Sequence, residues 1–246
     1  MESYKELARI YDELIYTDID YVAWKEKILT ICTELNIAFQ DYLDLACGTG
    51  NMTELLSPFF KSTWGVDLSE DMLIVAEEKF REKRIRVKLI RQDITLLNLN
   101  KQFDLITCCL DSTNYITKEV DIQKFFTGVS NHLKTKGIFI FDVNSYHKLK
   151  NIIASNTFTY CEDDLAYIWE NYPDGDNICM FITFFVKEGE VYKRYDEEHV
   201  ERAYTEVILD KILDDSGFSV IVKLDNYSSK DINCLTERIT YVVMKQ

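Results

Sequence analysis

The chain has 246 residues, of which 47% are hydrophobic, and it contains only 2 prolines and 8 glycines. This composition excludes a disordered or collagen-like chain and provides for one large core, or for a core with an added lobe. The 28 lysines and arginines against 42 aspartates and glutamates give a net charge of −14. Such a surface repels phosphate groups, so broad binding to nucleic acid or to an anionic membrane is disfavoured.

The seven cysteines are scattered and form no C-x-x-C pair, which is typical of reduced, mostly buried thiols. The start of the chain has no basic segment followed by an apolar one. No apolar run approaches the roughly 20 residues of a membrane-spanning helix. We therefore expect a cytoplasmic protein without a membrane span.

The first forty residues carry apolar side chains at helical spacing, which predicts two amphipathic helices before the first strand. From Tyr42 onward, short apolar runs alternate with helical stretches, a pattern typical of a parallel sheet covered by helices on both faces. The helices are expected to start near Asn51, Glu70 and Glu119, and Ser69 is placed to cap the second of these. The predicted strands are Tyr42–Ala46, Thr63–Asp67, Val87–Gln92, Phe103–Leu110 and Gly137–Val143.

Residues 158–198 interrupt this alternation. The segment is rich in aromatic side chains, and two turn signals around Gly175 and Gly189 separate β-rich runs, which predicts an antiparallel meander. A helix from near Glu198 to Asp215, capped by Gly217, would then return the chain to the main sheet. The expected strands of this part are Leu165–Tyr172, Ile178–Val186 and Glu190–Glu197 in the meander, and Phe218–Asn226 and Arg238–Met244 at the end of the chain.

The chain is accordingly predicted to have two parts. Residues 1–150 and 199–246 would form one α/β domain, and residues 151–198 an inserted antiparallel β lobe that serves as a lid or substrate lobe.

The most informative segment is Tyr42–Asn51 (YLDLACGTGN), a strand that runs directly into a turn and opens a helix. Gly48 and Gly50 allow left-handed backbone angles and a close approach of the backbone to a ligand. A lone G-x-G is equally compatible with a plain tight turn. Asp67 favours a ligand, because it ends the next strand, where a carboxylate can accept hydrogen bonds from both hydroxyls of a ribose.

Two further acids follow later strands, Asp93 after the third and Asp111 after the fourth. Together with Asp44 and Asp67 they would lie along one edge of the sheet. Ligands of open α/β sheets bind at the carboxyl ends of the strands. Each acid alone is an ordinary turn residue, but their joint placement predicts a binding site at this edge.

A nicotinamide or flavin site is the alternative, and the glycine spacing disfavours it. A dinucleotide fingerprint that begins at Gly48 needs a third small residue at position 53, which is Thr53. The diphosphate also needs a helix N-terminus that is free of acidic groups. Asp44 lies just before the turn, where a carboxylate suits a cationic ligand.

These residues resemble the class I S-adenosylmethionine-dependent methyltransferases. Within residues 41–145, the segments similar to the family's motifs are Leu43–Gly50, with Ala46 in place of the first glycine, Gly65–Ser69, Gln92–Ile94 and Leu133–Asp142. The resemblance implies an α/β fold with a Rossmann-like, mostly parallel sheet whose last strand is antiparallel. The inserted β lobe is similar in layout to that of sugar-amine N-methyltransferases and of glycine or sarcosine-type enzymes.

The resemblance also implies S-adenosylmethionine as the cofactor. The residues that would bind it are Asp44, Ala46, Gly48, Gly50, Asp67, Leu68, Met72, Asp93, Ile94 and Leu110. The first four would hold the methionine moiety, and Asp67 the ribose hydroxyls. Leu68 and Met72 would flank the adenine, and Asp93 would accept a hydrogen bond from its exocyclic amine. Leu110 would lie near the sulfonium.

On the substrate side the resemblance implies Tyr11, Tyr21, Trp24, Asp111, Asn144 and His199. The three aromatic residues would belong to N-terminal helices that cap the site, although packing of the cap onto the sheet is the alternative role. His147 and Tyr11 are the candidate catalytic residues. His147, after strand five, or His199, at the start of the expected return helix, could deprotonate an amine or a hydroxyl, and a structural role is the alternative for both.

Methyl transfer from a sulfonium is an in-line displacement with an activated donor, so the protein mainly aligns the nucleophile and excludes water. It needs no metal, and the three histidines have no metal-binding spacing. The resemblance implies a small-molecule acceptor, with amine nitrogen favoured over oxygen because several carboxylates could hold a cationic amine. The alternatives are a non-catalytic cofactor-binding or partner-docking protein and a methyltransferase for a macromolecule, of which tRNA is disfavoured by the net charge. The oligomeric state is not predicted.

Overall fold

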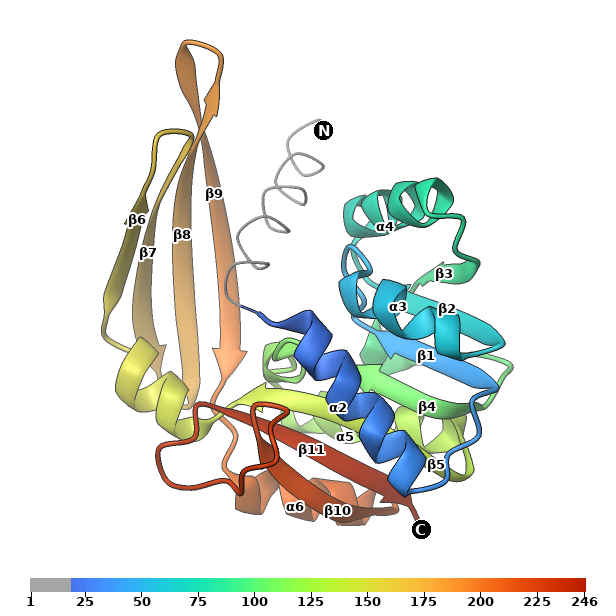
Figure 1. Ribbon diagram of the computed structural model, residues 1–246. Helices are drawn as coiled ribbons and strands as arrows, with labels where there is room; N and C mark the ends of the chain where they lie inside the picture. Colours follow the sequence, from blue (N-terminus) through green and yellow to red (C-terminus); the bar gives the residue numbers. More distant parts are fainter. Residues whose placement is uncertain (1–18) are drawn as a thin grey trace.

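The computed structural model describes residues 19–246, and it contains two sheets that stand at an angle to each other (Figure 1). The first predicted N-terminal helix lies outside the described residues. In spatial order, the larger sheet consists of β10 (Phe218–Asp225), β11 (Arg238–Lys245), β5 (Leu133–Asn144), β4 (Phe103–Cys108), β1 (Asp41–Leu45), β2 (Ser62–Asp67) and β3 (Val87–Arg91). β11 runs antiparallel to both of its neighbours, and the remaining pairs are parallel. The predicted α/β fold with a reversed last strand is therefore confirmed.

Helices cover both faces of this sheet. The α-helices are α2 (Tyr21–Glu34), α3 (Asn51–Leu56), α4 (Glu70–Glu82), α5 (Glu119–His132) and α6 (Glu206–Asp215), and the short helical turns are η1 (Ser57–Phe59), η2 (Ile94–Leu96), η3 (Ser112–Tyr115) and η4 (Lys148–Ile153). α2 and α3 bury Trp24, Ile28 and Met52 on one face, whereas α5 and α6 bury Phe125 and Leu209 on the other. Within residues 19–246, no helix has the length and apolar character to cross a membrane.

The start of α4 shows how local sequence positions the strand end before it. The Ser69 hydroxyl accepts a hydrogen bond from the Met72 backbone N–H at 3.3 Å, which confirms the predicted cap. Glu70 lies in the first turn and Lys79 in the last, where their charges complement the helix dipole. The helix therefore begins directly after β2 and leaves Asp67 at the strand end.

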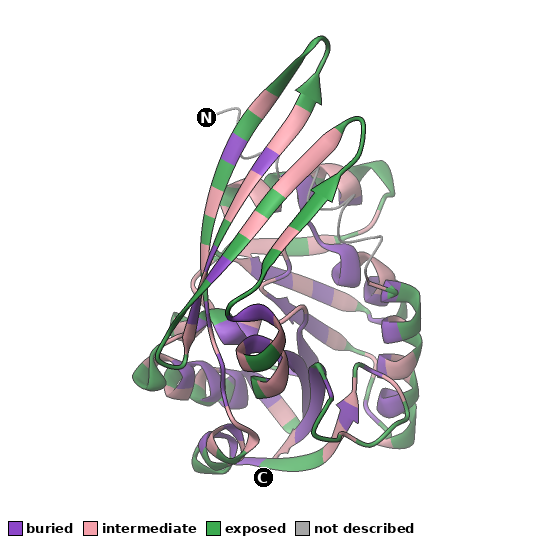
Figure 2. Cartoon of the chain, turned by 90° about the vertical axis from the view of Figure 1, so that its left-hand side faces the viewer, coloured by how far each residue is buried: buried purple, intermediate pink, exposed green. Residues whose placement is uncertain are grey.

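The second sheet is the lobe, an antiparallel meander in the order β6 (Thr157–Cys161), β7 (Leu165–Asp174), β8 (Asn177–Glu188) and β9 (Val191–Arg202). Its base packs on η4, where Leu149 and Ile153 contact Ile178 and Met180. Burial decreases toward its far end (Figure 2). The meander is confirmed, but the prediction missed β6. The division of the chain into domains at residues 150 and 198 stays a prediction.

The expected helix from Glu198 is wrong in its first part. β9 continues to Arg202, and α6 begins only at Glu206, with Thr205 as its N-cap. The charged residues of this segment are compatible with a helix. In the structure its backbone pairs with β8 from Asn177 to Glu188, and every second side chain lies on the same face of the sheet as the apolar side chains of β8. This pairing outweighs local propensity because it satisfies the backbone and buries one face of the strand. The expected C-terminal glycine is confirmed, since Gly217 adopts a φ of 80° after α6.

His132 is buried at the end of α5. Its Nδ1 lies 2.7 Å from the Gly128 carbonyl, and its Nε2 accepts a hydrogen bond from the Leu99 backbone N–H at 2.7 Å. The ring therefore attaches the loop before β4 to α5.

Candidate active site

A cavity of about 880 Å³ opens at the carboxyl ends of β1 to β4, and the lobe contributes one of its walls. The four strand-end acids Asp44, Asp67, Asp93 and Asp111 all line it. Of the other predicted cofactor residues, Ala46, Gly48, Leu68, Met72, Ile94 and Leu110 line it as well. The sheet thus brings together residues from four separate strand ends.

The turn after β1 leaves open backbone on the cavity side. Ala46, Gly48 and Gly50 all have positive φ angles, of 50°, 55° and 82°. A Cβ atom added to Gly48 would meet nothing within 4 Å, so its backbone faces free space and fits close approach by a cofactor. A Cβ on Gly50 would lie 2.4 Å from Cζ of Phe80. Gly50 is required by packing against α4, and it does not line the cavity.

Asp44 is a buried carboxylate directly below this turn. Thr53 Oγ1 donates to its Oδ2 at 2.5 Å, and Thr107 Oγ1 donates to its Oδ1 at 2.7 Å. Burial raises the pKa of Asp44 to about 6, although these two hydrogen bonds oppose the rise. Both hydroxyls donate to the carboxyl group, which stabilises its ionised form, and the group lines the cavity.

Asp67 organises the turn and the next strand end together. Its Oδ2 accepts a hydrogen bond from the Gly48 backbone N–H at 2.7 Å, and its Oδ1 accepts one from the Ser69 N–H at 2.8 Å. Burial raises the pKa of Asp67, and the backbone hydrogen bonds oppose that rise. Each oxygen has a second lone pair, so a pair of ribose hydroxyls can be accepted by the same carboxylate.

The carboxyl ends of β2 and β3 also contribute apolar side chains to the cavity. Leu68 and Met72 line one side of it, and Asp93 and Ile94 another. Asp93 Oδ1 accepts hydrogen bonds from the backbone N–H and the hydroxyl of Thr95, both at 2.8 Å, which fixes the carboxyl group at the start of η2. The arrangement is suited to a flat ring with an amino group at its edge.

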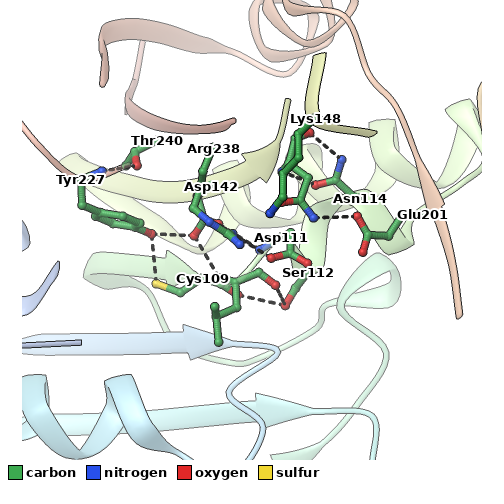
Figure 3. Close-up of polar contacts among 12 residues, drawn as sticks. Cys109, Asp111, Ser112, Asn114, Asp142, Lys148, Glu201, Tyr227, Arg238 and Thr240 are labelled. Carbon is green, nitrogen blue, oxygen red and sulfur yellow. Dashed lines mark hydrogen bonds and ion pairs between the residues drawn. The ribbon is translucent and has the colours of Figure 1, made fainter. Parts of the chain in front are cut away.

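The loop after β4 is held in an unusual conformation. Leu110 and Asp111 both have left-handed backbones, with φ angles of 58° and 48°. Their backbone N–H groups donate to the two oxygens of Asp142, each at 2.9 Å (Figure 3). Asp142 lies on β5 and is fully buried, so the loop is fixed by a residue of the neighbouring strand.

Arg238 and Tyr227 complete this network. The Arg238 guanidinium forms ion pairs with Asp142 and, at 2.7 Å, with Asp111, and the Tyr227 hydroxyl donates to Asp142 at 2.7 Å (Figure 3). Burial alone would lower the pKa of Arg238, but the two carboxylates outweigh it and raise this pKa above its ordinary value. The paired charges hold the Asp111 carboxyl group at the edge of the cavity.

The predicted substrate-side residues have different positions. Tyr21, Asp111 and His199 line the cavity, whereas Trp24 and Asn144 do not. Trp24 is buried and stacks on Tyr227 with 4.2 Å between the ring centroids. Asn144 is buried and its side chain donates to Glu201 at 2.9 Å. Both residues therefore lie outside the cavity and pack against residues that support it.

Of the two predicted catalytic candidates, only His147 belongs to the described residues. His147 lies outside the cavity lining, with its Nδ1 3.0 Å from the Asn151 amide nitrogen. Tyr11 lies outside the described residues. In residues 19–246, no three histidine, cysteine, aspartate or glutamate side chains are grouped so that they could hold a metal.

Sequence reasoning missed several residues of the site. Glu197 and Phe184 line the cavity from the lobe, and Asp142 and Arg238 fix the loop after β4. Reading residues 191–202 as a strand, in which every second side chain lies on the same face, could have placed Glu197 and His199 together. An aspartate within the apolar run before Val143 is also a signal, because a buried carboxylate needs partners.

Comparison with known proteins agrees with this geometry. The family model described as "Methyltransferase domain" matches residues 43–137. YqeM of Bacillus subtilis (strain 168) is 30% identical over 98% of this chain and 97% of its own length. A solved S-adenosylmethionine-dependent methyltransferase from Clostridium acetobutylicum is 53% identical, with a TM-score of 0.94 over 98% of both chains.

The chain belongs to the class I S-adenosylmethionine-dependent methyltransferases. S-adenosylmethionine is the methyl donor of this methyltransferase. More distant similarity shows the fold alone: the sugar N-methyltransferase KedS8 from Streptoalloteichus is 17% identical, with a TM-score of 0.79 over 95% of this chain and 92% of its own.

Proposed function

We propose that this methyltransferase transfers the methyl group to an amine nitrogen of a small, unphosphorylated molecule. The observation that carries the proposal is the acidic lining of the cavity beyond the loop after β4. Asp111, Asp121 and Glu197 line this part, from the loop, from α5 and from the lobe. An ammonium group is stabilised by such carboxylates because they are partly removed from water.

The charge of the whole lining supports the same substrate class. Among the described residues that line the cavity, seven are acidic and one is a lysine, namely Asp44, Asp67, Asp71, Asp93, Asp111, Asp121, Glu197 and Lys118. A phosphate or diphosphate group would need several cationic partners or a helix N-terminus without nearby acids. Asp44, Asp67 and Asp93 would face the cofactor. The remaining acids still outnumber the single lysine, which favours a cationic acceptor over a phosphorylated one.

The size of the cavity supports a small molecule. About 880 Å³ is at the upper end of the range for small-molecule sites, enough for a nucleoside cofactor together with a metabolite. The lobe contributes Phe184, Glu197 and His199 to the wall, so the acceptor would be partly enclosed. KedS8, which has the same fold, is a sugar N-methyltransferase, and this agrees with an amine acceptor.

The residues of the chain would bind and orient the reactants. Asp44, Gly48 and Asp67 would hold the methionine and ribose parts of the cofactor, and Leu110 and Asp111 would border its sulfonium. When bound, S-adenosylmethionine supplies a methyl group that is already activated toward a nucleophile. The enclosed site would align the acceptor nitrogen and exclude water, which is the main task of the protein in such a transfer.

The test is a transfer assay with methyl-labelled S-adenosylmethionine and defined acceptors. The amines are glucosamine, putrescine, tyramine and glycine, and the comparison acceptors are glycerol, catechol and tRNA. We expect label in at least one of the four amines. Label found only in catechol or glycerol, or only in tRNA, would contradict the proposal.

A matched pair of probes tests the charge argument. Glucosamine and glucosamine 6-phosphate differ by one phosphate group, and the acidic lining should lower kcat/KM for the phosphate ester by about tenfold or more, equivalent to roughly 1.4 kcal/mol. A phosphate ester that is methylated as well as glucosamine would show that the lining does not select against anions.

A further inference from the structure

Glu197 and His199 form a pair on β9 that faces the cavity. They are two residues apart on a strand, so their side chains lie on the same face. His199 Nε2 lies 2.9 Å from Glu197 Oε2, and both residues line the cavity. Across the strand pair, β8 places Ile182 and Met180 opposite them, so their neighbours on β8 are apolar.

The imidazole of His199 also contacts the main domain. The Tyr115 ring, in η3 just after the loop that holds Leu110 and Asp111, meets it edge to face with 5.8 Å between the ring centroids and an interplanar angle of 89°. His199 is therefore fixed by a carboxylate on one side and by an aromatic ring on another, and it is close to the loop that borders the sulfonium end of the site.

Other ionisable groups share this side of the cavity. Glu201 lies on the same face of β9, two residues beyond His199, but it is buried and bonded to Asn144. The groups that line the cavity from other elements near this end are Asp111, Tyr115, Lys118 and Asp121. Asp111 is paired with Arg238, and Asp121 with Lys124. Among these groups, His199 is the imidazole, the kind of side chain that most often serves as a general base.

We propose that His199, oriented by Glu197, accepts the proton that the acceptor ammonium must lose before its nitrogen can be methylated. This inference rests on the proposed amine acceptor. An ammonium nitrogen has no lone pair, so it cannot attack. One N–H bond of the ammonium breaks, its electron pair stays on nitrogen as the nucleophilic lone pair, and the proton forms a new N–H bond at Nδ1 of the neutral imidazole.

Glu197 acts in this step as a positioning residue. With the Nε2–H donated to the Glu197 carboxylate, the lone pair of the ring is on Nδ1. The carboxylate then stabilises the imidazolium that forms, and His199 returns the proton to solvent after the transfer. The pair is thus a proton acceptor on the lobe, in the wall of the cavity that the main domain also lines.

The first test needs neither cofactor nor acceptor. Long-range ¹H–¹⁵N NMR of the ligand-free protein reports the tautomer of each of the three histidines, and the spectrum of His199→Asn assigns the ring of interest. We expect the neutral His199 ring to carry its proton on Nε2. A neutral ring that carries its proton on Nδ1 would overturn the proposal.

The second test is the pH profile of methyl transfer to the amine of the panel that is methylated fastest. At pH 7 we expect His199→Asn to lower kcat by about 10²- to 10⁴-fold, the range for loss of a general base. The loss should shrink as the pH approaches the pKa of the amine itself, about 8 to 10, because free amine is then abundant. Glu197→Gln should show a smaller loss with the same trend.

The matched control is Glu198→Gln, which makes the same charge change on the exposed side of β9. We expect it to leave the profile unchanged. A loss in His199→Asn that stays constant from pH 7 to 10 would mean that the residue only shapes the cavity. If no amine of the panel is methylated by the wild-type protein, the proposed function fails. The NMR measurement of the tautomer still tests the pairing of His199 with Glu197.

Discussion

The two glycines in the turn after β1 have different requirements. Both have left-handed backbones, but a Cβ at Gly48 would project into open space and one at Gly50 would collide with Phe80. The strain of a left-handed alanine is about 1–2 kcal/mol, and overpacking adds a further 1–3 kcal/mol. One turn therefore contains one position set by the cavity and one set by the core.

This difference is testable with two alanine variants. We expect Gly50→Ala to lower the free energy of unfolding by about 2–5 kcal/mol, and Gly48→Ala by only about 1–2 kcal/mol. Urea denaturation measures both. Gly48→Ala should instead lose affinity for S-adenosylhomocysteine in calorimetric titration. Equal losses of stability in the two variants would contradict the assigned roles.

The role of Asp67 in binding the ribose of the cofactor can be tested by substitution. Asp67→Asn removes the charge and one acceptor, and it should weaken S-adenosylhomocysteine binding by about 1–3 kcal/mol, the range for hydrogen bonds to a charged group. Glu70→Gln is the control, because Glu70 is exposed and pairs with Arg91 outside the cavity. Unchanged affinity in Asp67→Asn would mean that the ribose is bound elsewhere.

At the scale of elements, β5 supports the loop that follows β4. Asp142 accepts two backbone N–H groups from Leu110 and Asp111, and it also receives the Tyr227 hydroxyl and the Arg238 guanidinium. The left-handed residues are held in place because their N–H groups have charged, buried partners. The conformation of the loop therefore depends on a strand next to it and on β11.

Removal of the Asp142 carboxylate should lower the free energy of unfolding substantially. Asp142→Ala leaves the buried Arg238 and two backbone donors without this partner, so we expect a loss of about 3–5 kcal/mol in the free energy of unfolding. The measurement is urea denaturation. Glu237→Gln, next to Arg238 but exposed, should change stability by less than about 0.5 kcal/mol. If Asp142→Ala lowered the free energy of unfolding as little as the control does, the network would contribute little to stability.

At the scale of the whole molecule, a buried polar cluster joins the lobe to the larger sheet. The Asn114 amide donates to the backbone carbonyls of Asn144 and Arg202. The Asn144 amide donates to Glu201 (Figure 3). Lys148 from η4 donates to Asn144 at 2.9 Å. Burial, aided by the negative charge of Asp111, raises the pKa of Glu201 to about 8. The lobe is thus attached through a carboxyl group whose burial favours the protonated form.

The pH dependence of stability follows from this raised pKa. Between the ordinary value of 4.5 and about 8, folded Glu201 keeps a proton that the unfolded chain has lost. By linkage, its contribution to stability falls as the pH rises through this interval. Glutamine has no proton to lose, so the stability of Glu201→Gln relative to wild type should increase by roughly 4 kcal/mol between pH 5 and pH 9.

Urea denaturation at several pH values measures this difference. Glu198→Gln makes the same substitution at an exposed position, and its effect should not vary with pH. A difference between Glu201→Gln and wild type that is the same at pH 5 and pH 9 would mean that Glu201 is ionised in the folded protein throughout.

The reversed last strand was implied by the resemblance of the motifs to a known family. The sequence by itself determined the parallel sheet and the set of strand-end acids. These features depend on apolar periodicity, turn residues and chain order, all of which are local, and parallel strands bring their carboxyl ends to one edge whatever the other contacts are. Only the tertiary structure decided the role of Gly50, the support from Asp142 and Arg238, and the position of His199. Phe80, Asp142 and Arg238 are distant in the chain from the residues they hold. Pairing with β8 made a strand of a charged segment that local propensity assigns to a helix, and this pairing placed Glu197 and His199 together at the cavity.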